Sequence, residues 1–168
     1  MREVRLGWLR WLGVSAAVVV LDIATKAWIV RAFTLGESVE VTSFFNLVLM
    51  YNRGAAFSFL ATAGGWQRWF FTGVTIVIGA GILYMLRRQV GNALVSFALA
   101  LVLGGALGNL FDRLMFGYVI DFVQLHAAGY FWPAFNVADS AISVGVALLV
   151  WDSLRSGARP SPTARQEK

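Results

Sequence analysis

The chain has 168 residues, of which 58% are hydrophobic and 14% are charged, and its mean hydropathy is +0.68. A soluble globular domain is about 45–50% apolar and about 25% charged, so this composition argues against soluble, disordered and collagen-like classes. The absence of cysteine excludes disulfides, zinc–thiolate sites, iron–sulfur clusters and a cysteine nucleophile. The net charge of +5 does not indicate a nucleic-acid partner, because basic residues commonly flank membrane spans.

Four long apolar stretches predict a membrane protein of the all-α class. A helix needs about 20 residues to cross roughly 30 Å of hydrocarbon. The stretches that come close to this length cover residues 11–30, 69–86, 93–110 and 135–151. We therefore expect four transmembrane helices in one domain over residues 1–155. A polar, proline-containing tail over residues 156–168 is expected to be disordered.

The basic residues predict how these helices are oriented. Nine of the fourteen lysines and arginines lie before the first stretch, between the second and third, or after the fourth. These positions share one side of the membrane if the chain crosses four times, and the positive-inside rule makes that side the cytoplasm. Both termini are therefore expected in the cytoplasm. Cleavage of the first stretch as a signal peptide is not expected, because the apolar run continues into Asp22, Thr25 and Lys26.

Two segments are expected outside, on the extracytoplasmic side. The first covers residues 34–68, and the alternation in SVEVT at 38–42 predicts a strand. The second covers residues 111–134 and contains the apolar stretch VIDFV at 119–123. Both are too long for simple turns, so we expect short strands or an amphipathic piece resting on the outer membrane surface.

Polar residues form clusters at the outer ends of the predicted spans. Asp22, Thr25 and Lys26 share one helical face, where a structural ion pair competes with a functional role. Further along the chain, GNLFDR at 108–113 presents an amide, an acid and a base with the same spacing, and interfacial anchoring is the alternative for the two charges. The small residues Gly104 and Gly108 just before it predict close helix packing.

Three more polar groups lie at the same depth. Asn136 and Asp139 share one face at the outer start of the fourth span, where an acid also complements the helix dipole. Asp121 is embedded in an apolar string, although aspartate is depleted in strands. The stretch NRGAAFS at 52–58 has the composition of a turn. Helix packing could gather these groups near the outer membrane surface.

The chemistry that fits is a pair of aspartates. His126 stands alone and no HExxH motif is present, so neither a metal nor another cofactor is expected. A dyad of Ser58 and Lys26 is conceivable, but their spacing does not support it. Two carboxylates in one site cannot easily both ionise, so one can activate water while the other donates a proton. Asp121 and Asp139 are the best candidates for this pair.

The sequence closely resembles the bacterial lipoprotein signal peptidases, also called signal peptidase II, over about residues 8–155. The matching motifs occur in the order of the family on a four-span frame: DIATK at 22–26, NRGAAFS at 52–58, GGALGNLFDR at 104–113, VIDF at 119–122 and FNVADS at 135–140. The resemblance implies an aspartic endopeptidase with Asp121 and Asp139 as its dyad. It also implies a set of residues that bind substrate or support the site, namely Asp22, Lys26, Asn52, Gly54, Asn109, Arg113 and Asn136.

The same resemblance implies the substrate and the location. The substrate is a prolipoprotein whose lipobox cysteine carries diacylglycerol, and cleavage occurs on the amino side of that cysteine. The enzyme is expected in the bacterial cytoplasmic (inner) membrane, in contact with lipid, as a monomer with its site near the extracytoplasmic face. The alternatives are a small four-span transporter or proton-conducting module, which would favour charges spread through the membrane depth, and a structural membrane subunit.

Overall fold

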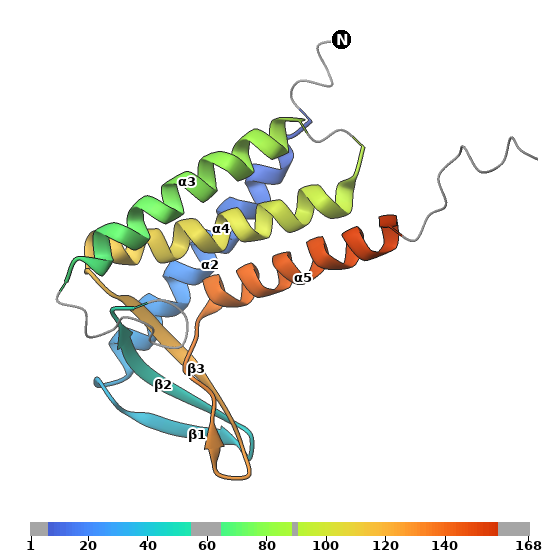
Figure 1. The fold of residues 1–168 in the computed structure, drawn as a ribbon. Coiled ribbons are helices and arrows are strands. Elements are labelled where there is room, and N and C mark those ends of the chain that lie inside the picture. Colours follow the sequence, from blue (N-terminus) through green and yellow to red (C-terminus); the bar gives the residue numbers. More distant parts are fainter. Residues whose placement is uncertain (1–6, 55–64, 89–90, 158–168) are drawn as a thin grey trace, which may run out of the picture.

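The computed structural model describes residues 7–54, 65–88 and 91–157. The elements in chain order are α2 (Leu9–Ala32), β1 (Ser38–Thr42), β2 (Phe45–Asn52), α3 (Gln67–Arg88), α4 (Ala93–Met115), β3 (Val119–Ala127), β4 (Tyr130–Phe131) and α5 (Val137–Gly157). The helices form a bundle and the strands form a sheet at one end of it (Figure 1).

Each of the four predicted spans is a helix long and apolar enough to cross a membrane. Large apolar side chains point outward from these helices, among them Val20, Val77 and Leu154, which are 65%, 72% and 68% exposed. Such faces suit hydrocarbon and not water. The expectation of four membrane-spanning helices with a small sheet is therefore confirmed.

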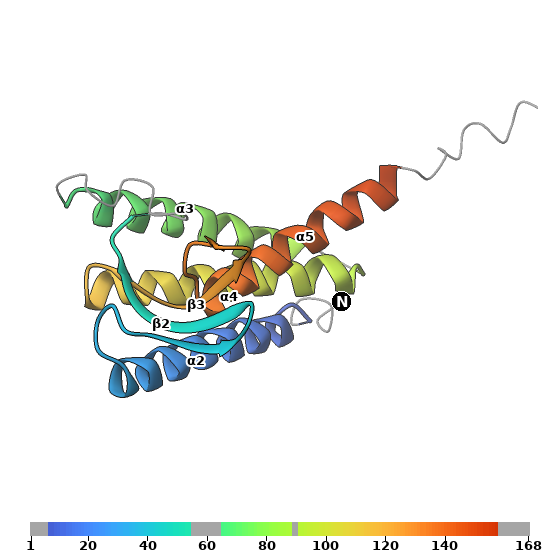
Figure 2. The same ribbon diagram turned by 90° about the horizontal axis from the view of Figure 1, so that it is seen from below.

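Helix α4 is the centre of the bundle and contacts α2, α3 and α5. Figure 2 shows it between α2 and α3, with α5 crossing its face. Glycines allow this close approach: a Cβ at Gly104 would lie 2.8 Å from the carbonyl oxygen of Ser15, and one at Gly108 would lie 2.7 Å from Oδ2 of Asp22. The predicted close packing at Gly104 and Gly108 is confirmed.

The sheet is antiparallel in the order β1-β2-β3-β4. The strand predicted over residues 38–42 is present as β1, and the stretch at 119–123 opens the longer strand β3. Strand β2 was not predicted, and its register places Met50 opposite Asp121. Asn52 is the last residue of β2, and its side chain accepts from the backbone N–H of Gly54, so the turn indicated by the composition of this motif begins where the strand ends. Residues 55–58 of the motif lie outside the described ranges.

A buried apolar cluster attaches the sheet to the bundle. It joins Ile29 of α2 and Leu49 of β2 with Ile120 and Phe122 of β3. These two β3 side chains flank Asp121 in sequence, so their burial fixes the strand on both sides of that acid. A bridge between Val123 and Phe135 then holds the connection that leads into α5.

The start of α2, the end of α3, the start of α4 and the end of α5 lie at the end of the bundle away from the sheet (Figure 1). Helix α5 extends to Gly157, so it includes the first two residues of the tail that was expected to be disordered. The remainder of that tail, residues 158–168, lies outside the described residues.

Candidate active site

Asp121 and Asp139 reach the same place from different elements. Asp121 is the third residue of β3 and is 3% exposed. Asp139 lies in the first turn of α5, where an acid also complements the positive end of the helix dipole. The connection between β3 and α5 folds back on the strand through the bridge between Val123 and Phe135, and this return brings the two acids together.

The fully buried amide of Asn136 contacts both acids. Its Nδ2 donates to Oδ1 of Asp121 at 2.7 Å, while its Oδ1 accepts from the backbone N–H of Asp139 at 2.9 Å. The backbone N–H of Asn136 also lies 3.3 Å from Oδ2 of Asp139 and donates to it. This reciprocal pairing resembles a capping box at the start of a helix. One side chain therefore starts α5 and ties Asp139 to Asp121.

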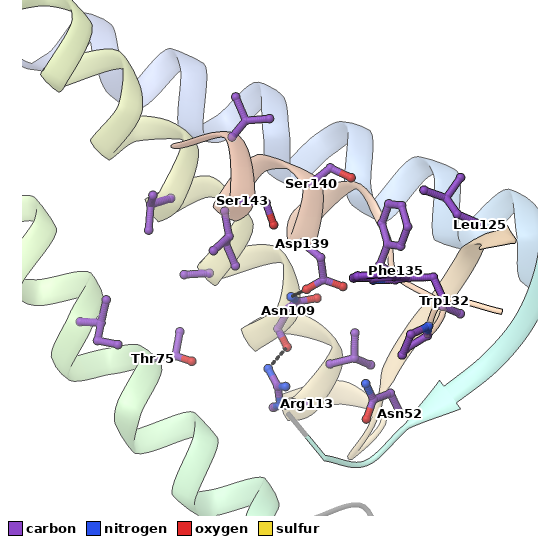
Figure 3. Close-up of a pocket in the computed structure, with 18 residues that line it drawn as sticks. Asn52, Thr75, Asn109, Arg113, Leu125, Trp132, Phe135, Asp139, Ser140 and Ser143 are labelled. Atoms are coloured by element: carbon purple, nitrogen blue, oxygen red, sulfur yellow. Dashed lines mark hydrogen bonds between the residues drawn. The ribbon is translucent and has the colours of Figure 1, made fainter. Parts of the chain in front are cut away.

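Asn109 of α4 makes the second contact to Asp139. Its Nδ2 donates to Oδ1 of Asp139 at 2.7 Å, and its Oδ1 accepts from Nδ2 of Asn136 at 3.3 Å. Figure 3 shows Asn109 and Asp139 facing each other across the α4–α5 contact. The two asparagines and two aspartates thus form one continuous hydrogen-bonded group.

Burial first, and the nearby negative charge of Asp139 second, raise the pKa of Asp121 to about 7. Hydrogen bonds from Asn52 and Asn136 favour the charged form and oppose this rise in pKa. A carboxyl group with such a pKa can hold a proton near neutral pH and exchange it readily, which suits general acid–base chemistry.

Asn52, Gly54 and Arg113 form the side of the site next to the sheet. Nδ2 of Asn52 donates to Oδ2 of Asp121 at 3.1 Å, and its Oδ1 accepts from the backbone N–H of Gly54 at 2.9 Å. Nη2 of Arg113 donates to the carbonyl oxygen of Gly54 at 3.2 Å, and its guanidinium lies 5.2 Å from the ring centroid of Phe71. The end of β2 is thereby tied to α4.

Lys26 of α2 lies on the opposite side of the site and is 2% exposed. Its Nζ pairs with Oδ2 of Asp22 at 2.6 Å and with Oδ2 of Asp112 at 2.8 Å. It also donates to Oδ1 of Asn109 at 3.3 Å. The ion pair considered for Asp22 and Lys26 is present, but Asp112 completes it, so interfacial anchoring does not describe Asp112, which is 1% exposed.

These contacts connect all nine predicted site residues in one network. Sequence reasoning placed Asp112 outside the set, although its position three residues after Asn109 on α4 was a signal that the two share a face. Thr25 does not join the network, because its hydroxyl donates to the carbonyl oxygens of Leu21 and Asp22 in its own helix. Ser58 lies outside the described residues.

A cavity of about 680 Å³ opens beside Asp139. Its far walls come from α3, through Thr75 and Ile78, and from α5, through Ser143 and Val144 (Figure 3). Asp139 lines this cavity and Asp121 does not, although Asn52, which donates to Asp121, is also on the wall. The hydroxyl-bearing residues on these walls were not predicted as site residues from the sequence.

His126 lies near the end of β3, where its ring stacks on Phe131 of β4 with the ring centroids 5.3 Å apart. Within residues 7–54, 65–88 and 91–157, no group of three or more His, Cys, Asp or Glu side chains is arranged to hold a metal ion. The groups that donate to Asp121 and Asp139 are side-chain amide N–H and backbone N–H groups, which bind carboxylate oxygens.

Four membrane-spanning helices, together with a buried Asp121 and a half-buried Asp139 that Asn136 bridges by hydrogen bonds, define a multi-pass membrane protein with a candidate aspartic site. A sequence model of the family described as signal peptidase (SPase) II matches residues 14–155. The chain therefore belongs to the signal peptidase II family, and it is a protease.

Individual relatives agree with this assignment. The chain is 59% identical over 147 residues to the lipoprotein signal peptidase of Cupriavidus necator, covering 88% of this chain and 84% of the relative. It is 57% identical over 145 residues to that of Ralstonia nicotianae, with 86% and 84% covered.

Two solved structures show the same fold. One, described as a bacterial membrane enzyme structure, has a TM-score of 0.81 at 32% identity and covers 95% of this chain and 93% of its own. A second with the same description has a TM-score of 0.76 at 33% identity, with 86% and 92% covered. The transporter and structural-subunit alternatives are therefore set aside, and the chain is a multi-pass bacterial membrane protein.

Proposed function

We propose that Asp121 and Asp139 are the catalytic dyad with which this protease removes signal peptides from prolipoproteins. The observation that carries the proposal is the buried Asn136, whose amide donates to the Asp121 carboxylate and accepts from the backbone of Asp139. A shared amide fixes the two acids relative to each other. Fixed geometry is what two groups need in order to act on one water and one carbonyl.

The reaction follows from the different surroundings of the two acids. Asp139 lines the cavity, so it is the carboxylate that takes a proton from a water entering there. Asp121 has a pKa of about 7 and holds the proton that passes to the scissile carbonyl oxygen. The water oxygen bonds to the carbonyl carbon, and the tetrahedral intermediate then breaks its C–N bond. Asp139 gives its proton to the leaving amine, and Asp121 regains one as the new carboxyl group forms.

The cavity suggests how a lipidated substrate binds. Its walls between α3 and α5 are largely apolar, with Ile78, Val102 and Ile142 among them, and its polar end is at Asp139. A diacylglyceryl cysteine has the same division between acyl chains and a peptide bond. We propose that the substrate enters sideways from the bilayer, with acyl chains along the apolar walls and the peptide bond on the amino side of the cysteine at the dyad.

The arginine distribution supports an orientation with both termini in the cytoplasm. Arg10, Arg87 and Arg155 lie near the helix ends away from the sheet. The sheet and the dyad are then at the extracytoplasmic face of the inner membrane. We propose a monomer there, because every residue of the network comes from one chain.

The test is cleavage of a diacylglyceryl lipobox peptide by purified protein in detergent. Asp121→Asn and Asp139→Asn should each lower kcat by at least roughly a thousandfold, since one acid cannot replace both roles. The matched control is Asp152→Asn, an acid of the same helix as Asp139 that accepts a hydrogen bond from Asn92. Wild-type turnover by either dyad variant contradicts the assignment, as does loss of activity in EDTA, which would indicate a metal.

A further inference from the structure

Three buried charges beside the dyad form a cluster that we call the lysine bracket: Asp22, Lys26 and Asp112. Their exposed fractions are 0%, 2% and 1%. The ammonium group of Lys26 lies between the two carboxylates, 2.6 Å from Oδ2 of Asp22 and 2.8 Å from Oδ2 of Asp112. The Lys26–Asp112 pair joins α2 to α4, whereas the Asp22–Lys26 pair lies within α2.

The Asp22 end of the bracket holds the backbone before Asp139. Oδ1 of Asp22 accepts from the backbone N–H of Ala138 at 2.9 Å, a contact between residues 116 positions apart. Ala138 immediately precedes Asp139 in the first turn of α5. Consecutive Cα atoms are about 3.8 Å apart, so anchoring Ala138 restricts where Asp139 can lie.

The Asp112 end holds the backbone before Asp121 in the same way. Oδ2 of Asp112 accepts from the backbone N–H of Ile120 at 3.0 Å. Ile120 immediately precedes Asp121 in β3. Each acid of the bracket therefore anchors the residue before one acid of the dyad, and the single ammonium of Lys26 joins the two anchors.

We propose that Asp112 is a positioning residue for the reaction, acting with Asp22 around Lys26 to fix the separation of Asp121 and Asp139. This inference rests on the proposed dyad. The contact of Asp112 to Asp121 runs through the backbone of Ile120, so Asp112 sets the place of that acid without touching the reacting atoms.

The cost of the bracket supports a positioning role. Removing three charges from water is expensive, and a buried ion pair is often no more stable than apolar side chains of similar volume. Charge-assisted hydrogen bonds to backbone N–H groups are, however, shorter and stronger than neutral ones. Charged acceptors at both anchors therefore hold β3 and α5 more tightly than amides or hydroxyls could.

The experiment compares Asp112→Asn and Asp112→Ala in the purified protein. Asparagine keeps an acceptor for the N–H of Ile120 but loses the pairing with Lys26, whereas alanine loses both. We expect kcat to fall about 100-fold in Asp112→Ala, because misplacing a catalytic group by about 1 Å can cost about 100-fold in rate. In Asp112→Asn, which keeps one of the two contacts, we expect a fall of about tenfold. KM for the lipidated peptide should stay within about threefold, since substrate contacts are unchanged.

The matched control is Ser15→Ala, which removes another buried contact between α2 and α4. Ser15 is 3% exposed and its Oγ donates to the carbonyl oxygen of Ala100 at 2.8 Å. This variant should melt at a lower temperature with unchanged kcat, as expected of a purely structural contact. A kcat for Asp112→Ala within threefold of that control overturns the proposal, and so does an equal effect of alanine and asparagine.

A second comparison separates this inference from the dyad itself. If Asp121→Asn is inactive while Asp112→Ala has the same kcat as Ser15→Ala, the positioning role of Asp112 is refuted and the assignment of the dyad stands. If Asp121→Asn retains wild-type turnover, both are wrong. Should Asp112→Ala fail to fold, Asp112→Asn decides the question. A tenfold loss of kcat at constant KM supports the positioning role of Asp112, and wild-type kcat overturns it.

Discussion

Replacing Gly105 by alanine perturbs the helix contact that places Asp139. A Cβ at this position of α4 would meet the carbonyl oxygen of Ala138, and it would lie 2.8 Å from Cγ1 of Ile142. Carbon atoms pack best at about 3.5–4.0 Å, so α5 must move away from α4 by roughly 1 Å. The backbone carbonyl cannot rotate aside within a helix, so the displacement is passed directly to Asp139.

Two quantities should change in Gly105→Ala. Displacing one acid of a dyad by about 1 Å is expected to lower kcat by about 100-fold. Overpacking of the interface should also cost roughly 1–3 kcal/mol of stability. The first is measured by single-turnover cleavage of a diacylglyceryl lipobox peptide, and the second by thermal unfolding followed through tryptophan fluorescence.

Gly73→Ala and Gly81→Ala are the matched controls. Both glycines lie in α3, and a Cβ at either would have no neighbour within 4 Å. Alanine is favoured over glycine in a helix by about 1 kcal/mol, so these variants should be as stable as wild type or more so, with unchanged kcat. The reasoning is refuted if Gly105→Ala cleaves substrate as fast as these controls.

Three further predictions concern protonation and metal dependence. Because Asp121 must be protonated to donate, kcat/KM should fall tenfold per pH unit above about pH 7. Asn52→Ala removes a hydrogen bond that lowers the pKa of Asp121, so in this variant the fall in kcat/KM should begin at a higher pH. The folded protein binds the Asp121 proton more tightly than the unfolded chain, so the contribution of this proton to stability is fully present below about pH 4 and is lost as pH rises to about 7. The melting temperature of Asp121→Asn should fall less over this pH range. Dialysis against EDTA should leave turnover unchanged, and restoration of lost activity by added metal would contradict an all-protein site.

The helices were predictable because hydrocarbon imposes a simple requirement on length and composition. Each predicted span corresponds to one helix, with ends displaced by a few residues. Strand β1 was predictable from its alternation. Strand β2 was not predictable, because FNLVLMYN has no clean alternation of apolar and polar residues. The strand is held by pairing with β3, a distant part of the sequence: Asn52 and Asp121, which share a hydrogen bond, are 69 positions apart.

The site was predictable as a set of residue types and not as a set of contacts. Unexplained polarity at one depth marked Asp121, Asn136 and Asp139 in the sequence. The amide geometry that makes Asn136 the link between them could not be read from spacing. The resemblance supplied the family, but no sequence pattern indicated that Asp22 binds the backbone of Ala138 across 116 positions.

Asp112 illustrates this limit most clearly. A charge at the end of a membrane helix is commonly an interfacial anchor, and the spacing of Asp112 from Asn109 indicates only that the two share a helix face. Its burial and its contacts to Lys26 and Ile120 arise only when α2, α4 and β3 pack together. Long-range contacts of this kind are a property of the folded chain and not of any local segment.

The most direct test of the central claim is a high-resolution structure of the protein bound to a peptide analogue that carries a hydroxyl in place of the scissile carbonyl. The account predicts that this hydroxyl lies within about 3 Å of one carboxyl oxygen of Asp121 and one of Asp139, with Asn136 still bridging the pair. A hydroxyl that contacts only one of the two acids, or binds away from both, would contradict the dyad.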